Sequence, residues 1–192
     1  MGKTLQVAAD REFDQSKTVV PAEVARGIYI QNPPGAQALK LMHLLIAIAG
    51  GRMADDVQHQ LRMADLKAIE GMRNHDRASL KALFRELAAA EINYDKPDEK
   101  RELTDSFVGM RDTDYRDEVS GNLIVKWKFS ELFRIIAAES NHWAILDRQT
   151  VFALSSKYAI LLFQHIASLA NLGRVSTKTF TVPELRAALG VP

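Results

Sequence analysis

Basic side chains recur every four residues in one stretch of this 192-residue chain, at Arg73, Arg77, Lys81 and Arg85. A helix over residues 76–90 brings positions four apart onto one face, so the last three would lie together. Apolar residues occupy the opposite face of such a helix. Lysine and arginine side chains donate hydrogen bonds to phosphate oxygens. The spacing therefore predicts contact with the phosphate backbone of a nucleic acid.

Polar and acidic neighbours leave a second interpretation of this stretch open. Asn74 carries an amide that can hydrogen-bond a phosphate, and it is also a candidate N-cap for the helix over 76–90. Asp76 and Glu86 would offset part of the positive charge, and basic helix faces occur on proteins of every function. A solvated helix face without a ligand is the alternative.

The clearest strand pattern in the chain carries two more basic candidates. Between Leu123 and Phe129, apolar residues alternate with Ile124, Lys126 and Lys128, which is the period of a half-buried strand. In a wing, the two lysines would lie over a phosphate backbone. Lysines on edge strands also block unwanted pairing, and the strand could instead pair with its own copy in a second subunit.

The surrounding patterns predict an α+β chain that is mainly helical. Apolar residues at helical spacing predict a helix from Ala36 to Gly50-Gly51, and two further helices near 61–70 and 76–90 form a helix-turn-helix outline. The remaining predictions, in chain order, are a strand from Ile92, a loop at 96–100, a short strand at 106–110, an acidic connection at 112–118, the strand at 123–129, a helix capped by Ser130, a short strand within 142–154, a helix over 156–171 and a helix capped by Thr181.

Two C-terminal motifs resemble those of a known family. Residues 155–163 read Ser-Ser-Lys-Tyr-Ala-Ile-Leu-Leu-Phe, and residues 179–191 read Thr-Phe-Thr-Val-Pro-Glu-Leu-Arg-Ala-Ala-Leu-Gly-Val. Similar motifs open the second winged helix of the plasmid replication initiator (Rep) family that binds origin iterons; Phe163 stands where that family usually has tyrosine. The helix-turn-helix and the segment 121–132 resemble the family's first winged helix with its β-hairpin wing.

The resemblance implies a domain organisation and partners. Residues 36–150 would form a first winged-helix domain that dimerises and contacts phosphates, and residues 151–192 would open a second one that is incomplete at Pro192. Residues 1–35 are expected to be poorly ordered or extended. The implied partners are double-stranded DNA with origin repeats, a second copy of the chain in a homodimer, and host replication proteins. The implied activity is DNA binding at the origin without catalysis.

Composition and missing motifs exclude several other classes. The chain has no cysteine, which excludes disulfide scaffolds, thiol enzymes and cysteine-ligated zinc. It contains no nucleophile motif or phosphate-binding glycine loop, and its five histidines show no metal-ligand spacing. We therefore expect no catalytic residues, no metal and no cofactor. The longest apolar stretch, 41–49, is too short to cross a membrane and no secretory signal is visible, so we expect a cytoplasmic protein.

Two other functions fit the same patterns. The net charge of +1 is unevenly distributed, with 5 positive and 9 negative residues in 93–119 against 8 and 4 in 120–192, which permits a local basic surface. A winged-helix transcriptional regulator would read its operator with the helix over 76–90. A protein–protein interaction module would dock a partner on the apolar face of the strand, formed by Leu123, Val125, Trp127 and Phe129.

Overall fold

A winged-helix arrangement lies at the centre of the molecule. The computed structural model describes residues 2–26, 33–116, 123–170, 172 and 178–191. The elements of this arrangement are α3 (Ala36–Ala49), β2 (His59–Arg62), α4 (Met63–Ala68), α5 (Arg77–Ala89), β5 (Val108–Asp114) and β6 (Ile124–Phe129). The strands form an antiparallel sheet in the order β2-β6-β5. A helix-turn-helix followed by two antiparallel strands of such a sheet confirms the predicted α+β class. Residues 117–122, between β5 and β6 in the sequence, lie outside the described residues.

Helix α3 is the central buried helix, as its apolar pattern predicts. Ten of its fourteen residues are buried, among them Leu39, Leu45 and Ile46. It ends at Gly50, whose φ of 52° suits a residue without a side chain. The helix contacts α5, β1 and α8, so it joins the segments on both sides of it in sequence.

The helix-turn-helix differs from the prediction in two details. The predicted helix over 61–70 is instead strand β2 followed by the short helix α4, because Leu61 pairs with Val125 across the sheet. Helix α5 is present as predicted, but its N-cap is Asp76 and not Asn74. The Asp76 carboxylate accepts from the backbone N–H of Ser79 at 2.7 Å, and the Asp76 N–H donates to the Ser79 hydroxyl at 2.8 Å, which satisfies two donors.

Strand β6 is the middle strand of its sheet, and this overturns two predictions. It pairs with β2 along one edge and with β5 along the other, so it cannot pair with its own copy in a second subunit. The apolar face proposed to dock a partner is fully inside the core, with Trp127 0% and Val125 1% exposed. Burial of that face removes the interaction module that depended on it.

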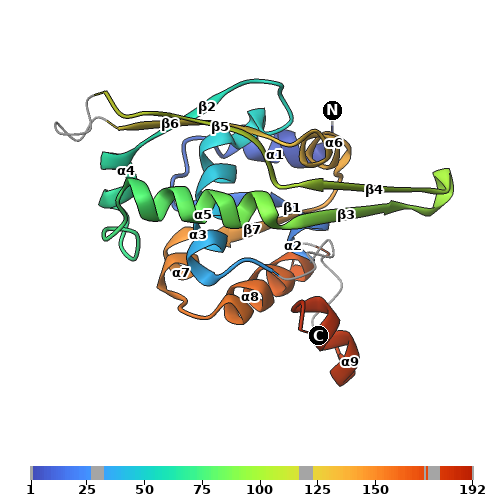
Figure 1. Ribbon diagram of the computed structural model, residues 1–192. Coiled ribbons are helices and arrows are strands. Elements are labelled where there is room, and N and C mark those ends of the chain that lie inside the picture. Colours follow the sequence, from blue (N-terminus) through green and yellow to red (C-terminus); the bar gives the residue numbers. More distant parts are fainter. Residues whose placement is uncertain (1, 27–32, 117–122, 171, 173–177, 192) are drawn as a thin grey trace.

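A long β-hairpin follows α5 in the sequence and precedes β5, the next strand of the three-stranded sheet. Strands β3 (Glu91–Lys96) and β4 (Arg101–Ser106) pair along their whole length and are joined by a 3-10 turn at Pro97–Glu99. Figure 1 shows this hairpin projecting from the body of the molecule beside α6. The predicted strand over 106–110 is split, since β4 ends at Ser106 and β5 begins at Val108. The predicted acidic connection is part of β5 as far as Asp114, and 117–118 lie outside the described residues.

The described residues of the N-terminal segment, 2–26 and 33–35, include two helices and a strand, whereas residues 1–35 were expected to be poorly ordered or extended. These elements are α1 (Lys3–Asp10), β1 (Lys17–Pro21) and α2 (Ala22–Ala25). Strand β1 pairs antiparallel with β7 (Trp143–Asp147), from Lys17 opposite Asp147 to Pro21 opposite Trp143. The sequence of β1 does not alternate between apolar and polar residues, because the adjacent residues Val19 and Val20 are both buried. Its partner strand also lies more than 120 residues later in the sequence. Sequence periodicity therefore did not predict this strand.

Helix α6 (Glu131–Glu139) begins at its predicted cap. The hydroxyl of Ser130 accepts from the backbone N–H of Phe133 at 3.2 Å, and Ser130 is only 2% exposed. We expect Ser130→Ala to lower the free energy of unfolding by about 1 kcal/mol, because it leaves that N–H without its partner. Urea unfolding of the two proteins measures the difference, and an unchanged midpoint would show that the cap contributes nothing.

The helices α7 (Arg148–Ala153) and α8 (Lys157–Ala170) near the C-terminus pack on the same hydrophobic core as the winged helix. Helix α7 follows β7 directly, and α8 packs on β7, α2 and α3. Ile160 and Leu161 of α8 belong to the one core cluster that also contains α3 and the sheet. The expected boundary at 150/151 falls inside α7, whose Val151 and Phe152 belong to the same core cluster as α8. Helix α9 (Val182–Ala188) has the predicted capping box of Thr181 and Glu184.

Candidate nucleic-acid interface

The exposed face of α5 carries the basic residues that the spacing predicts. Arg77, Lys81 and Arg85 are all exposed, while Leu80 and Leu87 on the other side are 2% and 0% exposed. The buried side packs on α3 and β5, which leaves the basic face outward. No ion pair or hydrogen bond joins the side chain of Lys81 or Arg85 to another described residue. We name Arg73, Asn74, Arg77, Lys81 and Arg85 the α5 basic face.

Residues at the start of α5 extend this surface. Arg73 and Asn74 lie in the turn before the helix and are exposed. The guanidinium of Arg77 lies 4.5 Å above the ring of Tyr115, just beyond the end of β5, a distance at which a cation and an aromatic ring attract. Tyr115 was not predicted as part of the site, because nothing in the sequence indicates that it approaches a helix almost forty residues earlier.

The acidic residues near this face are engaged elsewhere. Hydrogen bonds from Ser79 lower the pKa of Asp76 below its usual value, so this carboxylate stays ionised as the helix cap. The carboxylate of Glu86 accepts from the backbone N–H of Gly35 at 2.6 Å. Neither carboxylate forms an ion pair with Arg73, Lys81 or Arg85 in the part of the chain that the structure describes.

Lys126 and Lys128 lie on the other face of the sheet. Their neighbours Val125 and Trp127 point into the core, towards the side where the guanidinium of Arg111 lies 5.7 Å from the ring of Phe84 on α5. The two lysines alternate with these residues and so point away from α5. The structure thus separates the seven predicted residues into two groups on opposite sides of the sheet.

Lys128 has an acidic partner, and an acidic residue stands opposite Lys126. Lys128 Nζ lies 3.1 Å from Asp56 Oδ1, which is also 3.4 Å from Arg134 Nη1. These two cations lower the pKa of Asp56. Lys126 stands directly opposite Asp112 of β5 in the ladder. The outer face of the sheet is therefore of mixed charge, unlike the α5 basic face.

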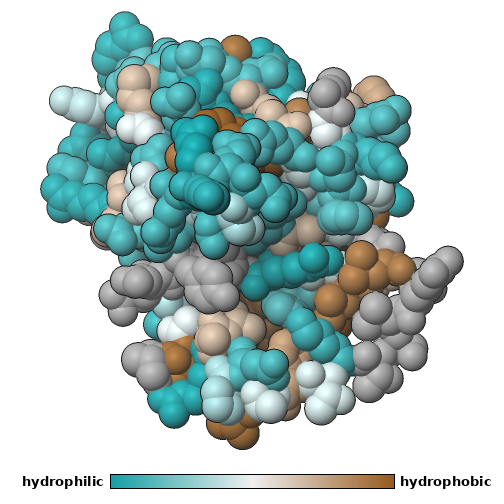
Figure 2. Space-filling view, turned by 90° about the vertical axis from the view of Figure 1, so that its right-hand side faces the viewer, coloured by the Kyte–Doolittle hydropathy of each residue, from teal (hydrophilic) through white to brown (hydrophobic). Residues whose placement is uncertain are grey.

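The β3–β4 hairpin is an unsuitable surface for a polyanion. Its strands and turn contain six acidic residues, Glu91, Asp95, Asp98, Glu99, Glu102 and Asp105, against Lys96, Lys100 and Arg101. Figure 2 looks towards the end of this hairpin and shows a largely hydrophilic surface around it, whereas apolar residues gather lower down, at the level of α8 and α9. Ile166 of α8 and Val182 of α9 are among the exposed large apolar side chains.

The described residues also bear on other kinds of site. They contain no group of three or more histidine, aspartate or glutamate side chains placed to hold a metal ion. Among the same residues, no helix has the length and apolar character needed to cross a membrane. His43 is buried between α3 and α8, where its Nε2 lies 3.1 Å from the Gln164 side-chain oxygen.

A comparison with family models identifies the chain. The model described as initiator replication protein, WH1, matches residues 28–167. The chain belongs to this replication initiator family. The matched range begins before α3 and ends within α8, so it contains the winged helix, the inserted hairpin and strand β7 of this initiator. Searches of curated proteins and of solved structures found no match to the chain.

Proposed function

We propose that this initiator binds double-stranded DNA at plasmid origin repeats through the α5 basic face, without catalysing a reaction. The observation that carries the proposal is the position of Lys81 and Arg85, which are exposed on the second helix of the helix-turn-helix with no acidic partner among the described residues. Such side chains are free to neutralise phosphates. Activity at a plasmid origin also places the protein in the cytoplasm.

Dimerisation is a further part of the proposed function. Because β6 is paired on both sides, a second copy would have to use another surface, and β5 has an edge without a neighbouring strand in its sheet as described. Light scattering of the purified chain tests the mass directly. The resemblance further suggests contacts with host replication proteins, and the Thr181 capping box supports α9 as the opening of a second winged helix.

Changing the α5 basic face should change the salt dependence of DNA binding. We expect the double variant Lys81→Ala/Arg85→Ala to bind duplex DNA more weakly and to lower the slope of log K against log salt by about 1.8, which corresponds to two lost phosphate contacts. Fluorescence anisotropy with a labelled duplex, titrated at several salt concentrations, measures both quantities. The same titration with a duplex carrying origin repeats compares specific with non-specific binding.

The matched control removes the same charge from the other side of the sheet. Lys126→Ala/Lys128→Ala should leave the slope nearly unchanged, since these lysines face Asp112 and Asp56. If this pair lowers the slope more than the α5 pair does, the outer face of the sheet is the binding surface. If the unmodified protein fails to bind any duplex at low salt, the proposed function is wrong.

A further inference from the structure

A cavity on the side of α7 is lined by a lysine, Lys40, that has no ion-pair or hydrogen-bond partner among the described residues. Its volume is about 850 Å³, and its walls come from α3, the turn after α4, the turn before β1, and α7. The residues that matter for its chemistry are Lys40, Ile69, Gly71, Arg148, Gln149 and Phe152. None of them belongs to the α5 basic face.

Lys40 is the unusual group in this cavity. It is a residue of α3 that is only 4% exposed, and its Nζ forms no hydrogen bond or ion pair with any described residue. Burial lowers the pKa of its ammonium group. The aliphatic part of Lys40 is buried, whereas its Nζ is not among the buried side-chain nitrogens without a partner and is accessible from the cavity. An anion in the cavity would give this ammonium group a charged hydrogen-bond partner.

Gly71 keeps the space beside this ammonium group open. Its φ is +84°, a conformation that residues with side chains rarely adopt. A Cβ atom at this position would lie 3.0 Å from the Phe152 carbonyl oxygen and 3.7 Å from Lys40 Nζ. The glycine therefore leaves room next to Lys40 that any other residue would fill.

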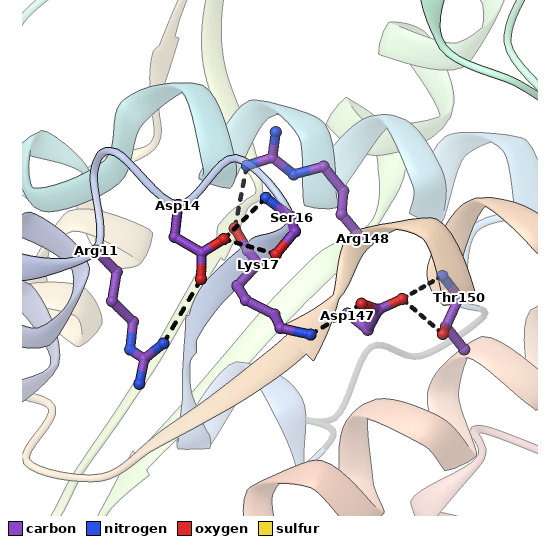
Figure 3. A network of polar contacts seen from close by, with 7 residues as sticks. All are labelled: Arg11, Asp14, Ser16, Lys17, Asp147, Arg148 and Thr150. Atoms are coloured by element: carbon purple, nitrogen blue, oxygen red, sulfur yellow. Dashed lines mark hydrogen bonds and ion pairs between the residues drawn. The ribbon is translucent and has the colours of Figure 1, made fainter.

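Arg148 provides a second cation in the same cavity. Its Nη2 donates to the Lys17 carbonyl oxygen at 3.1 Å, and its Nε is buried without a hydrogen-bond partner. Figure 3 shows this hydrogen bond, which holds the Arg148 side chain beside β1. Arginine and lysine on separate elements can contact different oxygens of one phosphate.

The acidic residues of the lining do not occupy these cations. Asp147 is bound by Lys17 Nζ at 2.9 Å and accepts from the backbone N–H and the hydroxyl of Thr150, as Figure 3 shows. Glu70 is exposed. Neither carboxylate forms an ion pair with Lys40 or Arg148. Lys40 is therefore free to contact a ligand, and Arg148, which Asp14 also attracts, adds a second positive charge to the lining.

We propose that this cavity binds a phosphomonoester of mononucleotide size, with its phosphate at Lys40 and Arg148. The volume is several times that of a phosphate ion and lies within the range of small-molecule sites. Ile69 and Phe152 give part of the lining an apolar character that suits an organic group. The proposal is independent of DNA contact by the α5 basic face.

Titration calorimetry with AMP, adenosine and inorganic phosphate tests the proposal. We expect the protein to bind AMP, to bind inorganic phosphate more weakly, and not to bind adenosine. Lys40→Met should raise the Kd for AMP about tenfold or more, as expected for losing a charged hydrogen bond. Lys81→Met, which removes an exposed lysine from α5, should leave the Kd unchanged. Absence of AMP binding, or an equal Kd for Lys40→Met, would overturn the proposal.

Hydrogen exchange of the unmodified protein localises the ligand without any variant. AMP should slow exchange of the amides of Gly71 and of residues 148–153, and it should do so even if Lys40→Met fails to fold. Protection confined to α5 would mean that AMP binds the basic face, and it would refute the cavity site. If a short duplex protects the cavity amides instead, the phosphate it binds belongs to DNA, and the proposed small ligand is wrong.

Discussion

Removing residues 1–21 is expected to abolish cooperative unfolding of this initiator. The deletion removes α1 and β1, and with them Leu5, Val19 and Val20, which are 5%, 6% and 0% exposed. Each such side chain stabilises the fold by about 2 kcal/mol when buried, so the three together approach the whole stability of a typical domain. Circular dichroism during heating should show no sharp transition for the shortened chain.

Lost hydrogen bonds add to this effect. Strand β7 would lose its only partner in the described sheet, leaving backbone groups of a buried strand without acceptors. The Thr4 hydroxyl also bonds Ser140 Oγ at 2.9 Å. Phe13→Ala is the control, because Phe13 is 95% exposed and lies in the same segment. A shortened chain that melts cooperatively at the original temperature would show that residues 1–21 are dispensable.

Local patterns predicted the elements that depend on neighbouring residues. Helix α3, helix α5, strand β6 and the cap at Ser130 all follow from apolar periods and cap residues within about fifteen positions. The basic face of α5 follows from the same helical period. These features could be read from the sequence because the residues that determine them are close together in it.

Contacts between distant segments could not be predicted in this way. Strand β1 forms because β7 pairs with it, and Lys17 and Asp147 are 130 positions apart. Strand β2 replaces a predicted helical turn because β6 is available as a partner. The same applies to the functional surfaces. The ion pair of Lys128 with Asp56 forms between residues that are far apart in the sequence. The cavity around Lys40 is likewise lined by segments that only the folded chain brings together.

The sequence predicts that His43 lies on an apolar helix, but it does not indicate how the folded surroundings change the pKa of the imidazole. Burial between α3 and α8 lowers the pKa of this imidazole to about 4, against an ordinary value of 6.5, although the hydrogen bond with Gln164 acts in the other direction. The folded protein therefore holds His43 neutral at a pH where the unfolded chain protonates it. The resulting stability is fully present above pH 6.5 and decreases as the pH falls towards 4.

The expected loss is about 2 kcal/mol between neutral pH and about pH 5, obtained from the difference between these two pKa values. Urea unfolding at both pH values measures it, and His43→Gln should remove this part of the pH dependence because glutamine does not titrate. Burial also lowers the pKa values of His59 and His165, so the test is the difference between the protein and the variant. His142→Gln, which alters an exposed histidine, should retain the full dependence. Equal pH dependence in the protein and in His43→Gln would show that His43 protonates as readily in the folded chain as in the unfolded one.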